Sequence, residues 1–282
     1  MEVSSPRTLA EALDEMGAQP ATVPLAGGTD LMVAINFGRE RPERVMALRR
    51  VEELHELTVN RRVRCGAGVT YTRLLEAVRD PAMVQAARTV GSPQIRNAGT
   101  LGGNLGTCSP AGDTLPVLAA LDAEVVVRSA AGAERRLNLG EWMRGPKKSA
   151  RRPEELVVAA EWDPAGSSQA FLKAGTRNAM VIAVANLALV VDRVRRRVGL
   201  AMGSVGPTIL RAQAAEDFAR GLFEEAGWER PHRPSPAAAE RFGALCAEAA
   251  APIDDVRGTA AYRRHVVAVM ARRALARTAA AV

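Results

Sequence analysis

Apolar residues recur along the chain with a spacing that switches between the helical and the strand period, which predicts a mixture of helices and strands. Thr8 and Glu11 form a capping-box pattern at the start of a helix expected to end at Gly17. The strands predicted in the first half lie at 22–25, 44–48, 57–59 and 63–66, with a hairpin over 124–137 that turns at 130–133. The further helices are expected at 31–35, 70–78, 82–90 and 115–121.

The pattern changes after Pro153. A break rich in proline, glycine and serine at 163–168 predicts a domain boundary, with one domain over 1–165 and a second over 168–282. Four apolar stretches are predicted to be successive strands of one antiparallel sheet, at 156–162, 169–174, 185–191 and 197–202. The rest, rich in alanine and arginine, predicts helices at about 211–226, 236–249 and 259–279.

A first glycine segment, Pro24–Leu31, leaves a predicted strand and enters a predicted helix. Its paired glycines, Gly27 and Gly28, let the backbone approach a bulky anion, and Thr29 adds a hydroxyl donor. Successive N–H groups at such a turn bind anions, and the helix dipole favours phosphate. Taken alone, the segment also fits an ordinary tight turn between a strand and a helix.

A second glycine segment, Gly91–Asp113, is poor in either regular period and is predicted to be a long loop. It repeats the glycine pair at Gly102-Gly103, and its other small polar residues would supply neutral donors to a diphosphate. Asp113 would accept hydrogen bonds from ribose hydroxyls. Two such segments in one chain favour a dinucleotide cofactor. The short polar residues of the second segment are Thr100, Asn104, Thr107 and Ser109.

Composition narrows the function classes. The net charge is +7, but the basic residues are nearly all scattered arginines without interleaved aromatics, which argues against nucleic-acid binding and suits an acidic protein partner. The three cysteines are far apart and predict neither a disulfide framework nor a metal or iron–sulfur site. The sequence shows no long apolar run and no signal-peptide pattern, so a cytoplasmic protein without a membrane span is expected.

The two glycine segments together resemble the FAD-binding medium subunit of the xanthine dehydrogenase and carbon monoxide dehydrogenase family, whose members belong to molybdenum hydroxylases. The likeness rests on Ala26–Leu31 and Gln94–Asn104, and it continues through Ser109–Asp113. In the second half, Phe171–Arg177, Ala201–Thr208 and Ile253–Arg263 also fit the family pattern. The resemblance therefore covers nearly the whole chain.

The resemblance implies an α+β fold: a PCMH-type FAD domain of two subdomains, about 1–56 and 57–165, then a domain with a three- to four-stranded antiparallel sheet and helices. It implies that two backbone segments hold the FAD diphosphate, that Asp113 binds ribose, that Thr107 lies beside the cofactor, and that Val157 and Lys173 lie near the nucleotide or flavin. The residues expected at the diphosphate are Leu25, Ala26, Gly27, Gly28, Thr29, Asp30, Leu31, Thr100, Leu101, Gly102, Gly103 and Asn104.

The resemblance also implies a division of labour among subunits. A large subunit would carry the molybdenum cofactor and a small one the iron–sulfur clusters, commonly as a dimer of heterotrimers. This chain would pass electrons through FAD to NAD+, a quinone or oxygen, and it needs no catalytic side chain of its own. Three alternatives stay open at this point: a self-contained flavin oxidase or reductase, a basic nucleic-acid-binding module, and a nucleotide-binding scaffold without electron transfer.

Overall fold

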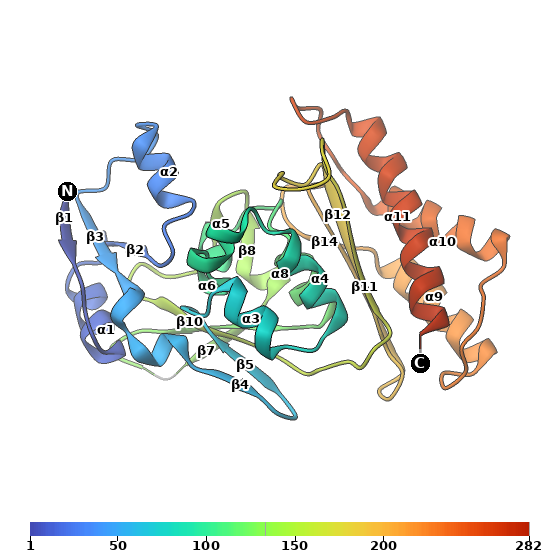
Figure 1. Cartoon of the computed structure of the whole chain (residues 1–282), viewed down its shortest axis with the longest axis horizontal. Coiled ribbons are helices and arrows are strands. Elements are labelled where there is room, and N and C mark those ends of the chain that lie inside the picture. The colour runs from blue at the N-terminus through green and yellow to red at the C-terminus, as the bar shows by residue number, and fades with distance from the viewer. Residues whose placement is uncertain (133, 282) are drawn as a thin grey trace.

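The computed structural model describes residues 1–132 and 134–281. The three larger sheets follow one another along the long axis of the molecule, each with its own helices, and a fourth sheet has only two strands, β8 and β9 (Figure 1). The helices are α1 (Leu9–Ala18), α2 (Leu31–Asn36), α3 (Tyr71–Ala77), α4 (Pro81–Thr89), α5 (Pro93–Ala98), α6 (Leu101–Thr107), α7 (Thr114–Ala120), α8 (Leu139–Trp142), α9 (Gln213–Ala226), α10 (Pro236–Ala249) and α11 (Ala260–Ala280). The strands are β1 (Glu2–Ser4), β2 (Val23–Leu25), β3 (Arg44–Ala47), β4 (Leu57–Val59), β5 (Val63–Gly66), β6 (Glu124–Arg128), β7 (Arg135–Asn138), β8 (Met143–Gly145), β9 (Lys148–Ser149), β10 (Leu156–Trp162), β11 (Gln169–Ala174), β12 (Ala185–Asp192), β13 (Arg197–Gly203) and β14 (Leu210–Arg211).

The N-terminal sheet is small and parallel, in the order β1-β3-β2. Helix α1 begins at the predicted capping box: the Thr8 side chain accepts from the Glu11 N–H, and the Glu11 side chain accepts from the Thr8 N–H. Its apolar face buries Ala12 and Met16, one turn apart, against the core. Two short 3₁₀ turns, Leu48–Arg50 and Glu52–His55, lead from this sheet to the next one.

The central sheet is antiparallel, in the order β4-β5-β10-β6-β7, and it corrects one prediction. The stretch 156–162 was expected to pair with the C-terminal strands, but β10 lies between β5 and β6. All seven of its residues are buried, as suits a central strand. A continuous apolar run predicts a buried strand but does not identify the sheet to which that strand belongs, so the pattern left this question open. The hairpin of β6 and β7 is confirmed; its predicted turn at 130–133 includes Ala133, which lies outside the described residues.

The predicted long loop over Gly91–Asp113 is also wrong, because it contains two helices, α5 and α6. Each begins at a hydroxyl cap: Ser92 accepts from the Ile95 N–H, and Thr100 accepts from the Gly103 N–H. These caps offset the low helix propensity of the glycines that follow Thr100.

The C-terminal sheet is antiparallel, in the order β11-β12-β13-β14, and it confirms the predicted α+β architecture. Helices α9 and α11 contact one of its faces, while α4 and α7 of the central part contact the same strands. In Figure 1 this sheet stands between the two helix layers. Burial on both faces explains why β12 is apolar along nearly its whole length. Among the described residues, no helix is long and apolar enough to cross a membrane.

The contact between the central and C-terminal parts is close enough to require a glycine. A Cβ on Gly199 of β13 would lie 2.1 Å from the carbonyl oxygen of Ala120 in α7. We therefore expect Gly199→Ala to lower the free energy of unfolding by about 1–3 kcal/mol through overpacking, as measured by urea denaturation. The matched control is Gly221→Ala in α9, where a Cβ meets nothing within 4 Å and the change should stabilise the protein by about 0.5–1 kcal/mol. Equal stability of both variants would contradict the tight packing.

Candidate functional site

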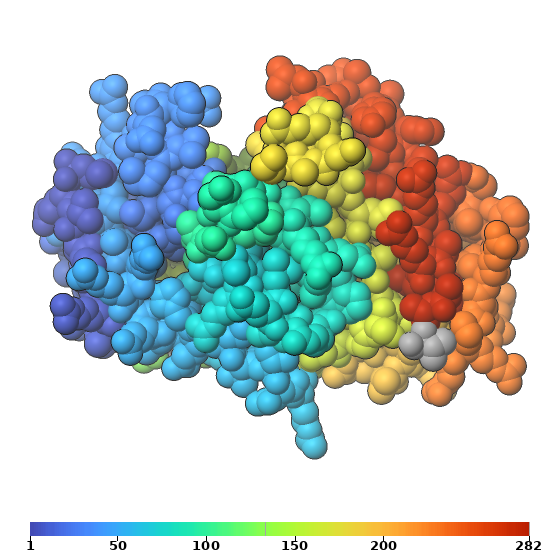
Figure 2. Space-filling model, viewed as in Figure 1, coloured from blue at the N-terminus to red at the C-terminus, as the bar shows by residue number. Residues whose placement is uncertain are grey.

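The structure brings the two glycine segments into direct contact. A Cβ on Gly27 would lie 1.8 Å from the carbonyl oxygen of Ala98, so only glycine fits there. The Thr107 hydroxyl of α6 donates to the Asp30 carboxylate at 3.3 Å, which ties the two segments together a second time. Helix α2 stands on one side of this contact and α5 and α6 on the other (Figures 1 and 2). The segments thus form one site although about 70 residues separate them.

The first segment supplies free backbone donors. Gly28 has a φ of +70°, and the turn that it makes carries four consecutive N–H groups, from Gly27 to Asp30, for which residues 1–132 and 134–281 offer no hydrogen-bond acceptor. Gly27, Gly28 and Thr29 are half-buried rather than covered. Successive unpaired N–H groups at a turn form a concavity that binds anions such as a diphosphate.

The backbone N–H groups at the start of α6, in the second segment, are already paired within the protein. Leu101 and Gly102 donate to the carbonyl oxygens of Val69 and Ala67, each at 3.1 Å, and Gly103 donates to the Thr100 hydroxyl at 2.9 Å. The Asn104 N–H is likewise taken, by the Thr100 carbonyl. Leu101 and Gly102 are buried, whereas Gly103 and Asn104 are half-buried. This segment therefore serves mainly as the wall against which the first segment packs, and less as a second set of donors.

Two further predicted residues, Asp113 and Lys173, pair with each other. The Lys173 Nζ lies 2.5 Å from Asp113 Oδ2; Asp113 is buried, and Lys173 is half-buried with 10% of its side chain exposed. Asp113 also accepts from the Thr89 hydroxyl at 3.1 Å and from Asn186 Nδ2 at 3.0 Å. Because Asp113 begins α7 whereas Lys173 and Asn186 belong to β11 and β12, this cluster joins the central part to the C-terminal sheet.

Burial is the main influence on the Asp113 carboxyl, and it raises the pKa above the usual range although Lys173, Asn186 and Thr89 act in the opposite direction. A buried carboxylate depends on such partners to remain charged. The remaining predicted residue, Val157, lies in β10 beside a register shift between Val157 and Ala159, and it is buried.

A cavity of about 580 Å³ opens beside the ion pair of Lys173 and Asp113. The Lys173 side chain is in its wall together with three arginines, Arg88, Arg96 and Arg177. Arg96 and Arg177 hydrogen-bond only to backbone carbonyls among the described residues, and no carboxylate lines the cavity. Lys173 is already paired with Asp113, but the three arginines face no carboxylate in the wall that the structure describes, and such a group of cations attracts negative charge. The other lining residues are Thr89, Gly91, Pro93, Ala174, Gly175, Asn178, Ala179, Met180 and Val181.

The sequence interpretation did not identify Arg88, Arg96 and Asn186 as parts of the site. Scattered arginines carry no signal of their own, because their grouping depends on how α4, α5 and β11 come together. One signal was available for Arg96, since it lies within the second glycine segment.

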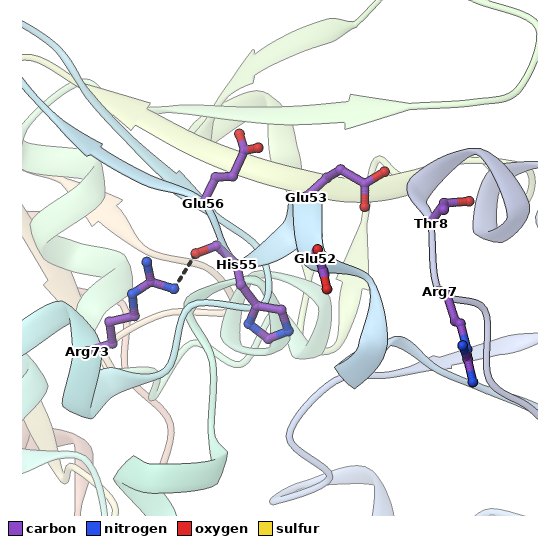
Figure 3. Close-up of a pocket in the computed structure, with 7 residues that line it drawn as sticks. All are labelled: Arg7, Thr8, Glu52, Glu53, His55, Glu56 and Arg73. Atoms are coloured by element: carbon purple, nitrogen blue, oxygen red, sulfur yellow. Dashed lines mark hydrogen bonds between the residues drawn. The ribbon is translucent and has the colours of Figure 1, made fainter.

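A second cavity, of about 480 Å³, lies away from the glycine segments near α1 (Figure 3). Its wall includes Glu52, Glu53, His55 and Glu56. Some of these groups make hydrogen bonds within the local structure. Arg73 donates to the His55 carbonyl at 2.5 Å, and Glu53 accepts from the first N–H of α1. Within the part of the chain that the structure describes, no group of three or more acidic, histidine or cysteine side chains is placed to hold a metal ion.

Comparisons with known proteins agree with this geometry. The family model "FAD binding domain in molybdopterin dehydrogenase" matches residues 1–161, and "CO dehydrogenase flavoprotein C-terminal domain" matches residues 170–278. A nicotinate dehydrogenase FAD-subunit of Eubacterium barkeri is 36% identical over 198 residues, which are 65% of this chain and 66% of that protein. A nicotine 6-hydroxylase medium subunit of Paenarthrobacter nicotinovorans is 29% identical over 96% of this chain and 95% of its own length. In a solved structure of carbon monoxide dehydrogenase from Oligotropha carboxidovorans, one chain has the same fold, with a TM-score of 0.87 at 24% identity over 99% of this chain and 98% of that one.

Proposed function

This chain belongs to the family of FAD-binding subunits of molybdopterin dehydrogenases, and from that premise we propose that it carries electrons from a partner's iron–sulfur clusters through FAD to an acceptor. Family membership makes it an oxidoreductase subunit with FAD as its cofactor. The proposal keeps the predicted division into an FAD-binding domain over 1–165 and a C-terminal domain over 168–282, which the family matches at 1–161 and 170–278 support.

The observation that supports the proposal most is the turn from Gly27 to Asp30, whose unpaired N–H groups fit a diphosphate. These groups would hold the phosphate oxygens, and Gly27 would let the second segment close against them. The half-buried Gly103 and Asn104 would border the cofactor from the other side. Lys173 would lie nearer the flavin end, in the wall of the basic cavity, and Val157 would lie near the nucleotide or flavin from β10.

Bound FAD would supply the redox chemistry, and the side chains of this protein would set its surroundings. Reduction adds negative charge to a flavin. The positive charges of Arg96 and Arg177 would stabilise that charge from the cavity wall, where no carboxylate opposes them, whereas Lys173 is already paired with Asp113. No general acid or base is needed for this task, which agrees with a site built from backbone donors and arginines.

The electrons must come from another subunit, because the three cysteines of this chain are each buried and free and are not grouped as ligands of an iron–sulfur cluster. A small subunit with iron–sulfur clusters and a large subunit with the molybdenum cofactor would supply them, in keeping with the name "medium subunit" of the relative from Paenarthrobacter nicotinovorans. We propose a dimer of such heterotrimers. The acceptor would be NAD+, a quinone or oxygen, and turnover of the purified complex with each of them in turn would identify it.

An absorption spectrum is the primary test. The purified chain is mixed with FAD, desalted, and compared with the complex isolated from its natural host. We expect a retained flavin band with about one FAD per chain, and bleaching of that band when the substrate of the partner subunit is added to the complex. A complex whose iron–sulfur centres become reduced by substrate while its flavin stays oxidised would refute the electron-transfer role. Turnover by the isolated chain would instead favour a self-contained flavoenzyme.

A further inference from the structure

Two loops at one end of the C-terminal sheet expose large apolar side chains. One connects β11 to β12 and carries Met180 and Ile182; the other connects α10 to α11 and carries Ile253 and Val256. Tyr262, in the first turn of α11, is exposed beside them. Both loops lie at the upper end of the sheet in Figure 1, and their surfaces adjoin in Figure 2. We call these five residues the C-terminal apolar patch.

The side chain of Arg263 joins the two loops beneath the patch. It is only 3% exposed; it donates to the carbonyl oxygen of Val184, at the end of the first loop, at 3.0 Å. The Nη2 atom of the same guanidinium group pairs with Asp255 of the second loop at 2.5 Å. The loops also touch directly, because a Cβ on Gly258 would lie 3.2 Å from a methyl group of Val184. The patch is therefore one surface and not two separate exposed segments.

Hydrogen bonds hold the second loop in a defined conformation. Asp255 accepts from the Arg257 N–H at 2.8 Å, and its backbone pairs with that of Gly258 in both directions. The Asp254 carboxylate accepts from the Ala260 N–H at the start of α11. This ordered loop nevertheless leaves Val256 fully exposed, at 102%. Apolar side chains that are held rigidly in solvent contribute nothing to the core, but they are preorganised for binding a protein partner.

We propose that the C-terminal apolar patch is the docking surface for the iron–sulfur subunit, an inference that rests on the proposed function. The first loop has two sides: Gly175 and Val181 line the basic cavity, Ile182 belongs to the patch alone, and the exposed Met180 belongs to both. A partner bound to the patch is thus separated from the cavity by the width of one loop. Of the two expected partners, the electron donor is the one that must come so near.

Charge around the patch fits an acidic partner. Arg177, Arg257 and Arg264 are exposed at its edge, whereas Asp255 is paired with Arg263 and Asp254 caps α11. An apolar centre with a charged rim is the usual organisation of a protein–protein interface. The rim arginines would guide an acidic surface toward the patch, and the apolar residues would form the buried centre.

The test replaces Val256 by aspartate in the complex, which is purified from its natural host through a tag at the N-terminus of this chain. That terminus lies at the far end of the molecule (Figure 1). A matched control is Val194→Asp, because Val194 is a 93% exposed valine of the same domain at the β12–β13 turn, at the opposite end of the sheet. Ile182→Asp tests the other loop at a residue outside the cavity wall. Iron, molybdenum and FAD are measured per chain.

We expect Val256→Asp and Ile182→Asp to lower the iron content at least about tenfold, since a charge at the centre of an interface is strongly unfavourable, with FAD content unchanged. Val194→Asp should keep all three at wild-type levels. Wild-type iron content in both patch variants, or loss of molybdenum alone, would overturn the assignment of this surface. A wild-type complex without iron–sulfur centres would instead refute the proposed function itself, so the two failures are distinguishable.

Discussion

Replacing Gly27 by alanine is expected to abolish the retention of FAD. The new Cβ would lie 1.8 Å from the Ala98 carbonyl oxygen and 2.5 Å from its carbon, and both atoms belong to the backbone of the second segment. The two segments would have to move apart by more than an ångström, since real Cβ atoms essentially never approach closer than 3.0 Å. The free N–H groups at Gly28 and Thr29 would then no longer face the wall against which the cofactor is held.

The measurement is the flavin absorbance that remains after the variant is mixed with FAD and desalted. Gly106→Ala is the matched control, because Gly106 lies in α6 of the same site, is exposed, and has no atom within 4 Å of an added Cβ. The control should retain FAD as the wild type does. If Gly27→Ala kept its FAD with unchanged affinity, the contact between the two segments would be irrelevant to cofactor binding.

Local signals account for the elements that the sequence predicted well. Thr8, Thr70 and Thr259 each cap the helix that was expected to start beside them, because a cap depends on residues only two or three positions away. The same kind of signal was overlooked at Ser92 and Thr100, where the many glycines suggested a loop. The hydroxyl caps there outweigh the glycines, and α5 and α6 result.

The sequence did not predict which residues far apart in the chain pair with each other. The apolar run of β10 predicted a strand correctly, but its neighbours β5 and β6 are set by the packing of the whole central sheet. The same holds for the site. Each glycine segment was identified from its own residues, whereas their contact at Gly27 depends on the fold. Asp113 and Lys173 were each predicted to lie near the cofactor, but 60 residues separate them and no spacing rule predicts their ion pair.

The second large effect is expected for Lys173→Met, which keeps most of the length of the side chain but removes its charge. The Asp113 carboxylate would then be buried without its cation, and the free energy of unfolding should fall by about 3–5 kcal/mol near pH 8. Burial already raises the pKa of Asp113, and loss of Lys173 would raise it further. A group whose pKa is higher in the folded than in the unfolded state favours folding at low pH, so the deficit should shrink as the pH falls and the carboxyl becomes protonated.

Urea denaturation at pH 8 and at pH 5 measures this difference. The control is the double variant Asp113→Asn with Lys173→Met, which removes both charges and leaves an amide that hydrogen-bonds to Thr89 and Asn186 without a buried charge. It should regain much of the stability lost at pH 8 and show little dependence on pH. A single variant as stable as the wild type at pH 8 would mean that the carboxyl is already protonated in the folded protein. The junction would then be held by hydrogen bonds instead of an ion pair.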